Sequence, residues 1–169
     1  MVQIIKVRSQ TDADAVYILA HEFVDWVRAR YPEMSSEIDG YLEHQKFDEQ
    51  IKDVLIHYCP PKGECLLAIH DDEPVGILML KDMGGQVCEM NRMFVRHTAR
   101  GLGIGRKLLE NLIAVSKDMG FEKMILSALS RHDEALALYR SSGFQISSKP
   151  ESSGSPDNAV HMSLNLTTS

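Results

Sequence analysis

The chain has 169 residues, 44% of them hydrophobic, which predicts one globular domain over residues 1–169 with a buried core. Its net charge of −6 argues against nucleic acid as a partner. The N-terminal residues lack an apolar signal region and no run approaches the ~18 apolar residues of a membrane span. We therefore expect a cytoplasmic protein that does not bind membranes.

The cysteines and histidines give no sign of a disulfide scaffold or a metal site. Cys59, Cys65 and Cys88 are odd in number and show no C-x-x-C spacing, and the histidines show no ligand spacing. Cys65 and Cys88 lie in apolar runs typical of small core residues. We expect a reducing compartment and no bound metal.

The first third of the chain alternates between strand and helix patterns. Residues 3–7 predict a short strand, and a capping-box pattern from Thr11 begins a helix that ends near Arg30, before Tyr31-Pro32. Residues 35–58 predict a second helical region, as one helix or as two pieces, because residues 43–45 interrupt its apolar stripe. Trp26, the only tryptophan, either lines a substrate pocket or packs against the core.

The rest of the chain predicts a mixed sheet. Residues 64–70 and 74–81 form an antiparallel hairpin, and residues 87–95 form the next strand. A glycine-rich turn and a helix over residues 103–119 lead to a strand at 123–129, which the crossover makes parallel to 87–95. A helix at 130–142, a strand from 144, a loop at 147–158 and a strand at 159–166 follow. The fold class is α/β, with antiparallel strands first and a central parallel pair joined by a crossover helix.

The glycine-rich turn predicts an anion-binding site. It comprises Arg100, Gly101, Leu102, Gly103, Ile104 and Gly105. Glycines let backbone amides approach a ligand, and the N-terminus of the following helix is electropositive. That helix has no capping side chain and carries Arg106 and Lys107 in its first turn, where a bound polyanion would offset their charge. The alternative is a surface turn with solvated cations.

These features together resemble a known family. The strand, the Arg-x-x-Gly-x-Gly turn, the helix, the next strand and the segment ALALYRSSGF at 135–144 resemble the GNAT superfamily of acetyl-CoA-dependent N-acetyltransferases. The diagnostic part runs from residue 87 to about 144, and the order of elements fits over nearly the whole chain. The resemblance implies a sheet whose parallel strands splay apart, acetyl-CoA as acyl donor, and an amine acceptor.

The resemblance also implies which residues bind coenzyme A. The residues of the turn and Arg106 would hold the diphosphate. Unpaired backbone groups at Met93, Phe94 and Val95 would bind the pantetheine arm as an added strand does, and an amide near Met93 would stabilise the oxyanion. His132 stands where many members have an asparagine. It could steady the pantetheine, act as an acid–base group, or be an exposed residue in the first turn of the helix.

Two residues are candidates for catalysis. Tyr139 matches the tyrosine that family members place beside the coenzyme A sulfur, where it can protonate the thiolate; the alternative is core packing. Glu89 is the candidate base, because an alkyl ammonium must lose a proton before it attacks. Strict alternation would place Glu89, Asn91, Met93 and Val95 on one face, although a β-bulge would break that count. A structural carboxylate paired with Arg92 or Lys81 is the alternative for Glu89.

The leading hypothesis is acetyl transfer from acetyl-CoA to a primary amine, of a small molecule or a peptide, by direct attack in a ternary complex. A catalytically silent coenzyme A sensor or interaction module is the second. Dinucleotide binding is a third, disfavoured because Arg106 replaces the third glycine of that fingerprint. Homodimers are common in such folds, and a homodimer is proposed for this chain by that analogy alone, as one of its possible states.

Overall fold

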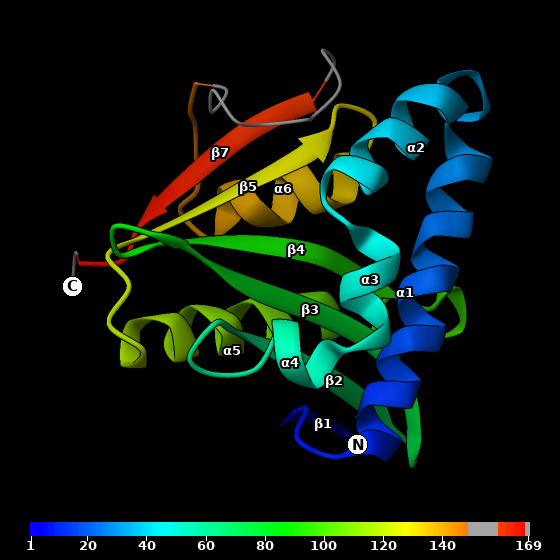
Figure 1. Cartoon of the computed structure of the whole chain (residues 1–169), viewed down its shortest axis with the longest axis horizontal. Coiled ribbons are helices and arrows are strands. Elements are labelled where there is room, and N and C mark those ends of the chain that lie inside the picture. Colours follow the sequence, from blue (N-terminus) through cyan, green and yellow to red (C-terminus); the bar gives the residue numbers. More distant parts are fainter. Residues whose placement is uncertain (149–158, 168–169) are drawn as a thin grey trace.

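The computed structural model describes residues 1–148 and 159–167. Its elements, shown in Figure 1, are β1 (Val2–Lys6), α1 (Gln10–Arg30), η1 (Pro32–Met34), α2 (Ser35–His44), α3 (Phe47–Lys52), α4 (Val54–His57), β2 (Gly63–His70), β3 (Glu73–Gly84), β4 (Val87–Val95), η2 (His97–Ala99), α5 (Ile104–Asp118), β5 (Lys123–Leu129), α6 (Asp133–Ser141), β6 (Gln145–Ile146) and β7 (Ala159–Asn165). Residues 149–158 of the loop predicted at 147–158 lie outside the described residues.

The strands form one mixed sheet. Within residues 1–148 and 159–167 it has seven strands, in the order β1-β2-β3-β4-β5-β7-β6. Neighbouring strands are antiparallel except β4 and β5, which are parallel. A parallel pair needs a long crossover connection, and α5 forms it. The predicted fold class, with its central parallel pair, is confirmed.

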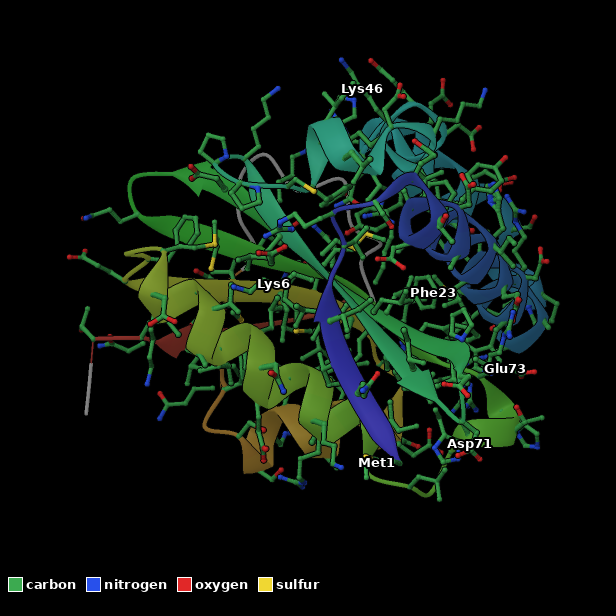
Figure 2. All side chains as sticks on the ribbon, turned by 90° about the horizontal axis from the view of Figure 1, so that it is seen from below. Met1, Lys6, Phe23, Lys46, Asp71 and Glu73 are labelled. Atoms are coloured by element: carbon green, nitrogen blue, oxygen red, sulfur yellow. The ribbon has the colours of Figure 1, made fainter. Side chains whose placement is uncertain are left out.

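Helices cover both faces of the sheet. Figure 2 shows α1 and the short helices on one face and α5 and α6 on the other. Leu108, Met124 and Met162 belong to the core under α5 and α6. Val16 and Leu67 belong to the core under α1–α4. The sheet is therefore buried on both sides, which explains the near-continuous apolar runs of its central strands.

Three short helices occupy the region predicted as one or two. Lys46, with a left-handed φ of 54°, separates α2 from α3. Asp53 separates α3 from α4 and has a φ of −123° and a ψ of 53°. The interruption at residues 43–45 indicated the first break. The second break was missed because Ile51 and Val54 on its two sides both pack in the core under α1 and so continue the apolar stripe.

β4 contains a β-bulge at Arg92. Ile77 of β3 pairs with Phe94, whereas Met79, two residues further along, pairs with Asn91, three residues back. Two residues of β4 therefore oppose one residue of β3. Arg92 has a φ of 56°, a conformation that is uncommon for a residue with a side chain.

The bulge reverses the alternation of side chains along β4. The prediction that Glu89, Asn91, Met93 and Val95 share a face is wrong, because an extra residue turns every later side chain to the opposite side. Met93 and Val95 pack against the core under α5 and α6, as do the two residues that flank Glu89. Glu89 and Asn91 consequently face α1–α4.

β4 and β5 separate after a short stretch of pairing. Their ladder ends at Glu89 and Ile125, although β4 runs on to Val95 and β5 to Leu129. Figure 1 shows the two strands diverging from there, and β5 pairs along its whole length with β7. The predicted splayed sheet is confirmed, and beyond Glu89 the edge of β4 that faces β5 has no strand partner among the described residues.

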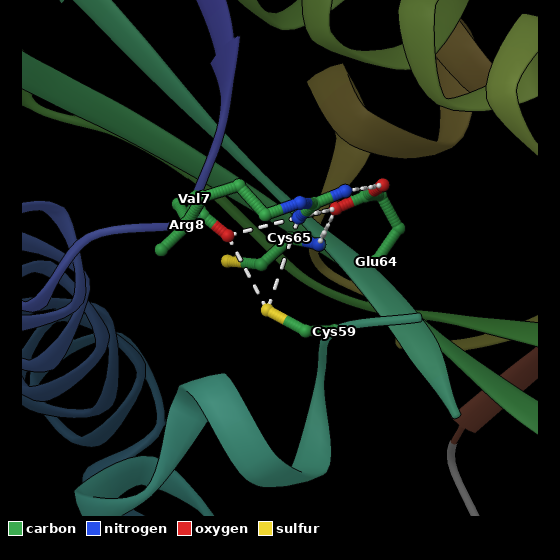
Figure 3. A network of polar contacts seen from close by, with 5 residues as sticks. All are labelled: Val7, Arg8, Cys59, Glu64 and Cys65. Carbon is green, nitrogen blue, oxygen red and sulfur yellow. Dashed lines mark hydrogen bonds and ion pairs between the residues drawn. The ribbon is translucent and has the colours of Figure 1, made fainter. Parts of the chain in front are cut away.

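An ion pair between a partly exposed arginine and a buried glutamate joins the segment after β1 to β2. Glu64, 1% exposed, accepts hydrogen bonds of 2.7 Å from both terminal nitrogens of Arg8, and one of 3.0 Å from the amide of Cys65. Figure 3 shows this network, in which Arg8 and the thiol of Cys59 also donate to the carbonyl of Val7. The two parallel bonds supply the partner that a buried carboxylate requires.

Candidate active site

A glycine-rich turn leads from β4 into α5. Gly101 and Gly103 have φ values of 83° and 76°, and a Cβ at either position would meet no atom within 4 Å. Glycine is therefore favoured there by the backbone conformation and not by lack of space. Gly103 is the N-cap of α5 and offers no side-chain hydrogen bond. The first amides of α5 thus lack the side-chain cap that usually satisfies them.

Cations gather where this helix begins. The first turn of α5 has no acidic residue, and both Arg106 and Lys107 are exposed there. Arg106 donates a hydrogen bond of 3.4 Å to the hydroxyl of Ser141 on α6. Positive side chains are unfavourable at a helix N-terminus, so a bound anion would stabilise this end of α5.

The other residues of the turn differ in their surroundings. Arg100 donates from Nε to the carbonyl of Val95 at 3.1 Å, and its guanidinium lies 5.1 Å from the ring of Trp26. Leu102 is exposed, whereas Ile104 is buried in the core under α5. Gly105 lies inside α5, where an added Cβ would be in ordinary contact with Leu138 and Met93.

A cavity opens where β4 and β5 diverge. Its walls come from α1 and α2 on one face of the sheet, from the two strands, and from α6 on the other face. The residues that line it include Trp26, Tyr41, Arg92, Met93, His132 and Tyr139. Its volume of about 160 Å³ is close to that of a cavity of ~150 Å³ that binds benzene. The gap between the strands therefore connects the two faces.

Known proteins are similar to this chain. A model of the acetyltransferase (GNAT) family matches residues 20–144. The chain belongs to the GNAT family of acetyltransferases. An uncharacterized N-acetyltransferase of Schizosaccharomyces pombe is 32% identical to this GNAT protein over 127 residues, or 74% of this chain and 77% of the relative. The protein is accordingly an acyltransferase.

Solved structures have the same fold. A GNAT family acetyltransferase of Staphylococcus aureus has a TM-score of 0.76 at 19% identity and covers 99% of this GNAT chain and 100% of its own. The PaiA N-acetyltransferase of Thermoplasma acidophilum, solved in complex with coenzyme A, has a TM-score of 0.73 at 18% identity and covers 98% of this chain and 99% of its own. These likenesses support the GNAT fold for this chain.

Tyr139 of this GNAT protein lies on the buried face of α6 and lines the cavity. It is 5% exposed, and its ring lies 5.9 Å from that of Phe144. Burial raises the pKa of the Tyr139 phenol, so the hydroxyl keeps its proton at neutral pH. The side chain packs in the core, as one alternative predicted, and it also lines the cavity. Its place beside the coenzyme A sulfur stays a prediction.

Glu89 lies where the pairing of β4 and β5 ends. Burial raises the pKa of its carboxyl group, against the opposing effects of the Asn91 side chain and the charges of Arg92 and Lys81. Among the described residues Glu89 belongs to none of the ion pairs formed within 4.0 Å. The cavity wall on β4 is formed by its neighbours Met90, Arg92 and Met93. Glu89 is thus a half-buried carboxylate beside the cavity.

His132 is partly buried, which excludes the exposed position that was one of the three alternatives predicted for it. It precedes α6, and its ring lies 5.0 Å from Trp26 and 5.3 Å from Tyr31. Burial lowers the pKa of the imidazole to about 4, and Nε2 has no hydrogen-bond partner among the described residues. His132 is therefore a neutral residue of the cavity wall, packed against aromatic rings of the N-terminal helices, which the local pattern could not indicate.

The sequence interpretation missed the place of Arg92 in the cavity and named it only as a partner of Glu89. The available signal was a cation inside the strand VCEMNRMFV, whose other residues are mostly apolar. Trp26 packs against the core under α1, as one alternative predicted, and it also lines the cavity. That this cavity binds a substrate stays a prediction.

The cysteines are free, and Cys65 and Cys88 are buried as predicted. Burial raises the pKa of Cys88 to about 12, which keeps it a thiol.

Within residues 1–148 and 159–167 no group of three or more His, Cys, Asp or Glu side chains could hold a metal ion. No helix of that part of the chain is long and apolar enough to cross a membrane.

Proposed function

We propose that this GNAT protein transfers the acetyl group of acetyl-CoA to a primary amine by direct attack in a ternary complex, with residues 1–169 acting as one domain. The observation that carries the proposal is the cavity in the gap between β4 and β5, which is lined from both faces of the sheet. The donor enters from the side of α5 and α6, and the acceptor enters from the side of α1 and α2.

The turn between β4 and α5 holds the diphosphate of the donor. The fit rests on the left-handed Gly101 and Gly103, whose open surroundings leave the backbone accessible, and on the uncapped start of α5. Backbone amides at a helix N-terminus bind phosphate oxygens. Arg100 and Arg106 add positive charge on the two sides of the turn, and the residues between them supply the amides.

The free edge of β4 holds the pantetheine arm. Phe94 and Val95 pair on one side with β3, and on the other side the part of the chain that the structure describes offers β4 no strand partner beyond Glu89. Backbone groups of Met93, Phe94 and Val95 can therefore bind an extended arm as a further strand. An amide at Met93 would then stabilise the oxyanion that forms at the thioester carbonyl.

In the transfer step the amine nitrogen bonds to the thioester carbon and the carbon–sulfur bond breaks. Tyr139 donates its proton to the leaving thiolate, a role that suits a phenol whose raised pKa keeps it protonated. Glu89 accepts the proton of the ammonium through water, since its neighbours form the cavity wall. Cys88 is a buried thiol and forms no acetyl intermediate.

The test is a screen for thiol release from acetyl-CoA against a broad panel of amines. We expect release with at least one amine, and initial-rate plots that intersect, as sequential kinetics require. Parallel plots would indicate a covalent intermediate and overturn direct attack. Thermal stabilisation by acetyl-CoA without thiol release would favour a silent coenzyme A module, and a larger thermal shift with NAD would favour dinucleotide binding.

A further inference from the structure

Arg92 is a buried cation between the sheet and the short N-terminal helices. Its side chain is 9% exposed. Nη1 donates to the hydroxyl of Tyr58 at 2.9 Å, and Nη2 donates to Oε1 of Gln45 at 3.2 Å. The guanidinium also lies 4.9 Å from the centroid of the Phe47 ring. All three partners are neutral, so they orient the guanidinium without balancing its charge.

No carboxylate neutralises this charge within 4.0 Å among the described residues. The ion pairs of arginine found there involve Arg8, Arg28, Arg96 and Arg131. A guanidinium has five N–H donors, and the hydrogen bonds to Tyr58 and Gln45 use only two of these donors. A buried charge is costly unless it is paired. The charge of Glu89 acts on Arg92, but the two form no ion pair within 4.0 Å. A counter-charge from outside the protein would supply that pairing.

The position of Arg92 in the cavity indicates that the counter-charge comes from the acceptor. Arg92 lines the cavity together with Trp26 and Tyr41 on the side assigned to the acceptor. Glu134 also lines the cavity, but it is an exposed residue of the first turn of α6. Arg92 keeps its left-handed φ of 56° at the bulge, and such strain on a residue with a side chain is typical of functional sites.

We propose that Arg92 binds a carboxylate of the acceptor, so that the acceptor is an amino carboxylic acid and not a simple amine. The proposal rests on the proposed acetyl transfer. The planar guanidinium fork matches a carboxylate with two parallel hydrogen bonds. Glu89 lies on the same face of β4, beside the amino group that must lose a proton. One cation and one carboxylate thus match the two charged groups of a zwitterion.

The test compares matched acceptors with and without a carboxylate, using the full chain, acetyl-CoA and thiol release. The panel contains the common amino acids, β-alanine and γ-aminobutyrate, each beside the amine that lacks its carboxylate, such as phenylalanine beside phenethylamine. We expect kcat/KM of the best amino acid to exceed that of its matched amine by about tenfold or more. Arg92→Met should remove this preference, and Arg92→Lys should keep part of it.

Lys81→Met is the matched control. Lys81 and Arg92 both act on Glu89 through their positive charge, so both variants perturb the base. Lys81 is not among the residues that form the cavity wall, and we expect its variant to keep the preference for the carboxylated acceptor. Loss of the preference in Lys81→Met to the same extent as in Arg92→Met would mean that Arg92 acts only through Glu89, and would overturn the proposal.

Failure of the proposal differs from failure of acetyl transfer. If simple amines are acetylated as fast as amino acids, acetyl transfer is supported and the carboxylate site is overturned. Turnover of phosphoethanolamine alone would have the same two consequences. If no acceptor releases thiol, the transfer is wrong, and N-acetylated amino acids in the presence of coenzyme A then test Arg92 by calorimetry. Binding to the unaltered protein that Arg92→Met weakens at least tenfold supports the carboxylate site, and equal or absent binding overturns it.

Discussion

Replacing Gly103 with glutamate tests whether the turn before α5 binds a diphosphate. Gly103 is exposed, with a φ of 76° and a ψ of 16°. An added Cβ would meet no atom within 4 Å, so the first side-chain atom causes no steric overlap. Gly103→Glu therefore has two separable effects, which are strain in a left-handed backbone and a negative charge at the proposed phosphate site.

The two effects have different magnitudes and different assays. A left-handed conformation costs a residue with a side chain about 1–2 kcal/mol, and each kcal/mol lowers the melting temperature of a domain of this size by ~2–4 °C. A carboxylate about 6 Å from one phosphate charge is repelled by ~0.7 kcal/mol in bulk water and by ~3 kcal/mol at an effective dielectric constant of ~20. The dissociation constant of acetyl-CoA should therefore rise about threefold to about a hundredfold.

Gly84→Glu is the matched control. Gly84 has a φ of 87° and also leaves space around an added Cβ, but it is the last residue of β3 and pairs with Val87, at the other end of β4. Both variants should lose similar thermal stability, and calorimetric titration with acetyl-CoA should show weaker binding only for Gly103→Glu. A folded Gly103→Glu protein that binds acetyl-CoA as tightly as Gly84→Glu would refute the assignment of the turn.

Arg8→Met should lower the free energy of unfolding in urea by about 1–3 kcal/mol, because it leaves the buried Glu64 without its partner while Arg8 itself is 46% exposed. The double variant Arg8→Met/Glu64→Gln should recover part of that loss, and no recovery would contradict the argument. Burial raises the pKa of the Glu89 carboxyl group above its ordinary value. The ionised carboxylate therefore destabilises the fold at pH values above the raised pKa, and this cost is absent at pH values below the ordinary pKa. Glu89→Gln should therefore be more stable at neutral pH but slower in turnover, and an unaltered pH–rate profile would exclude Glu89 as the base. Tyr139→Phe should reduce kcat by about 100-fold with little change in acetyl-CoA affinity, whereas equal turnover would make Tyr139 purely structural.

The sequence by itself determined the order of the strands and the positions of the glycines and cations in the turn before α5. The bounds predicted for the strands Val87–Val95 and Lys123–Leu129 agree with the structure, because both are apolar runs whose ends are marked by polar or glycine-rich turns. The crossover between them required a parallel pair at the centre of the sheet. Left-handed Gly101 and Gly103 are also local features, since they depend on the backbone of a few neighbouring residues.

Only the tertiary structure decided what surrounds the cavity. The bulge at Arg92, the end of pairing at Glu89 and the burial of His132 all depend on segments far apart in the sequence. A bulge needs just one extra residue to turn every later side chain to the other face, and no periodicity within β4 records where its partner strand shifts register. The position of the buried Arg92 charge in the cavity likewise depends on tertiary structure, because the cavity forms only where α1, α2, β4 and α6 meet. Local patterns reflect interactions within a segment, whereas register and burial come from contacts between segments.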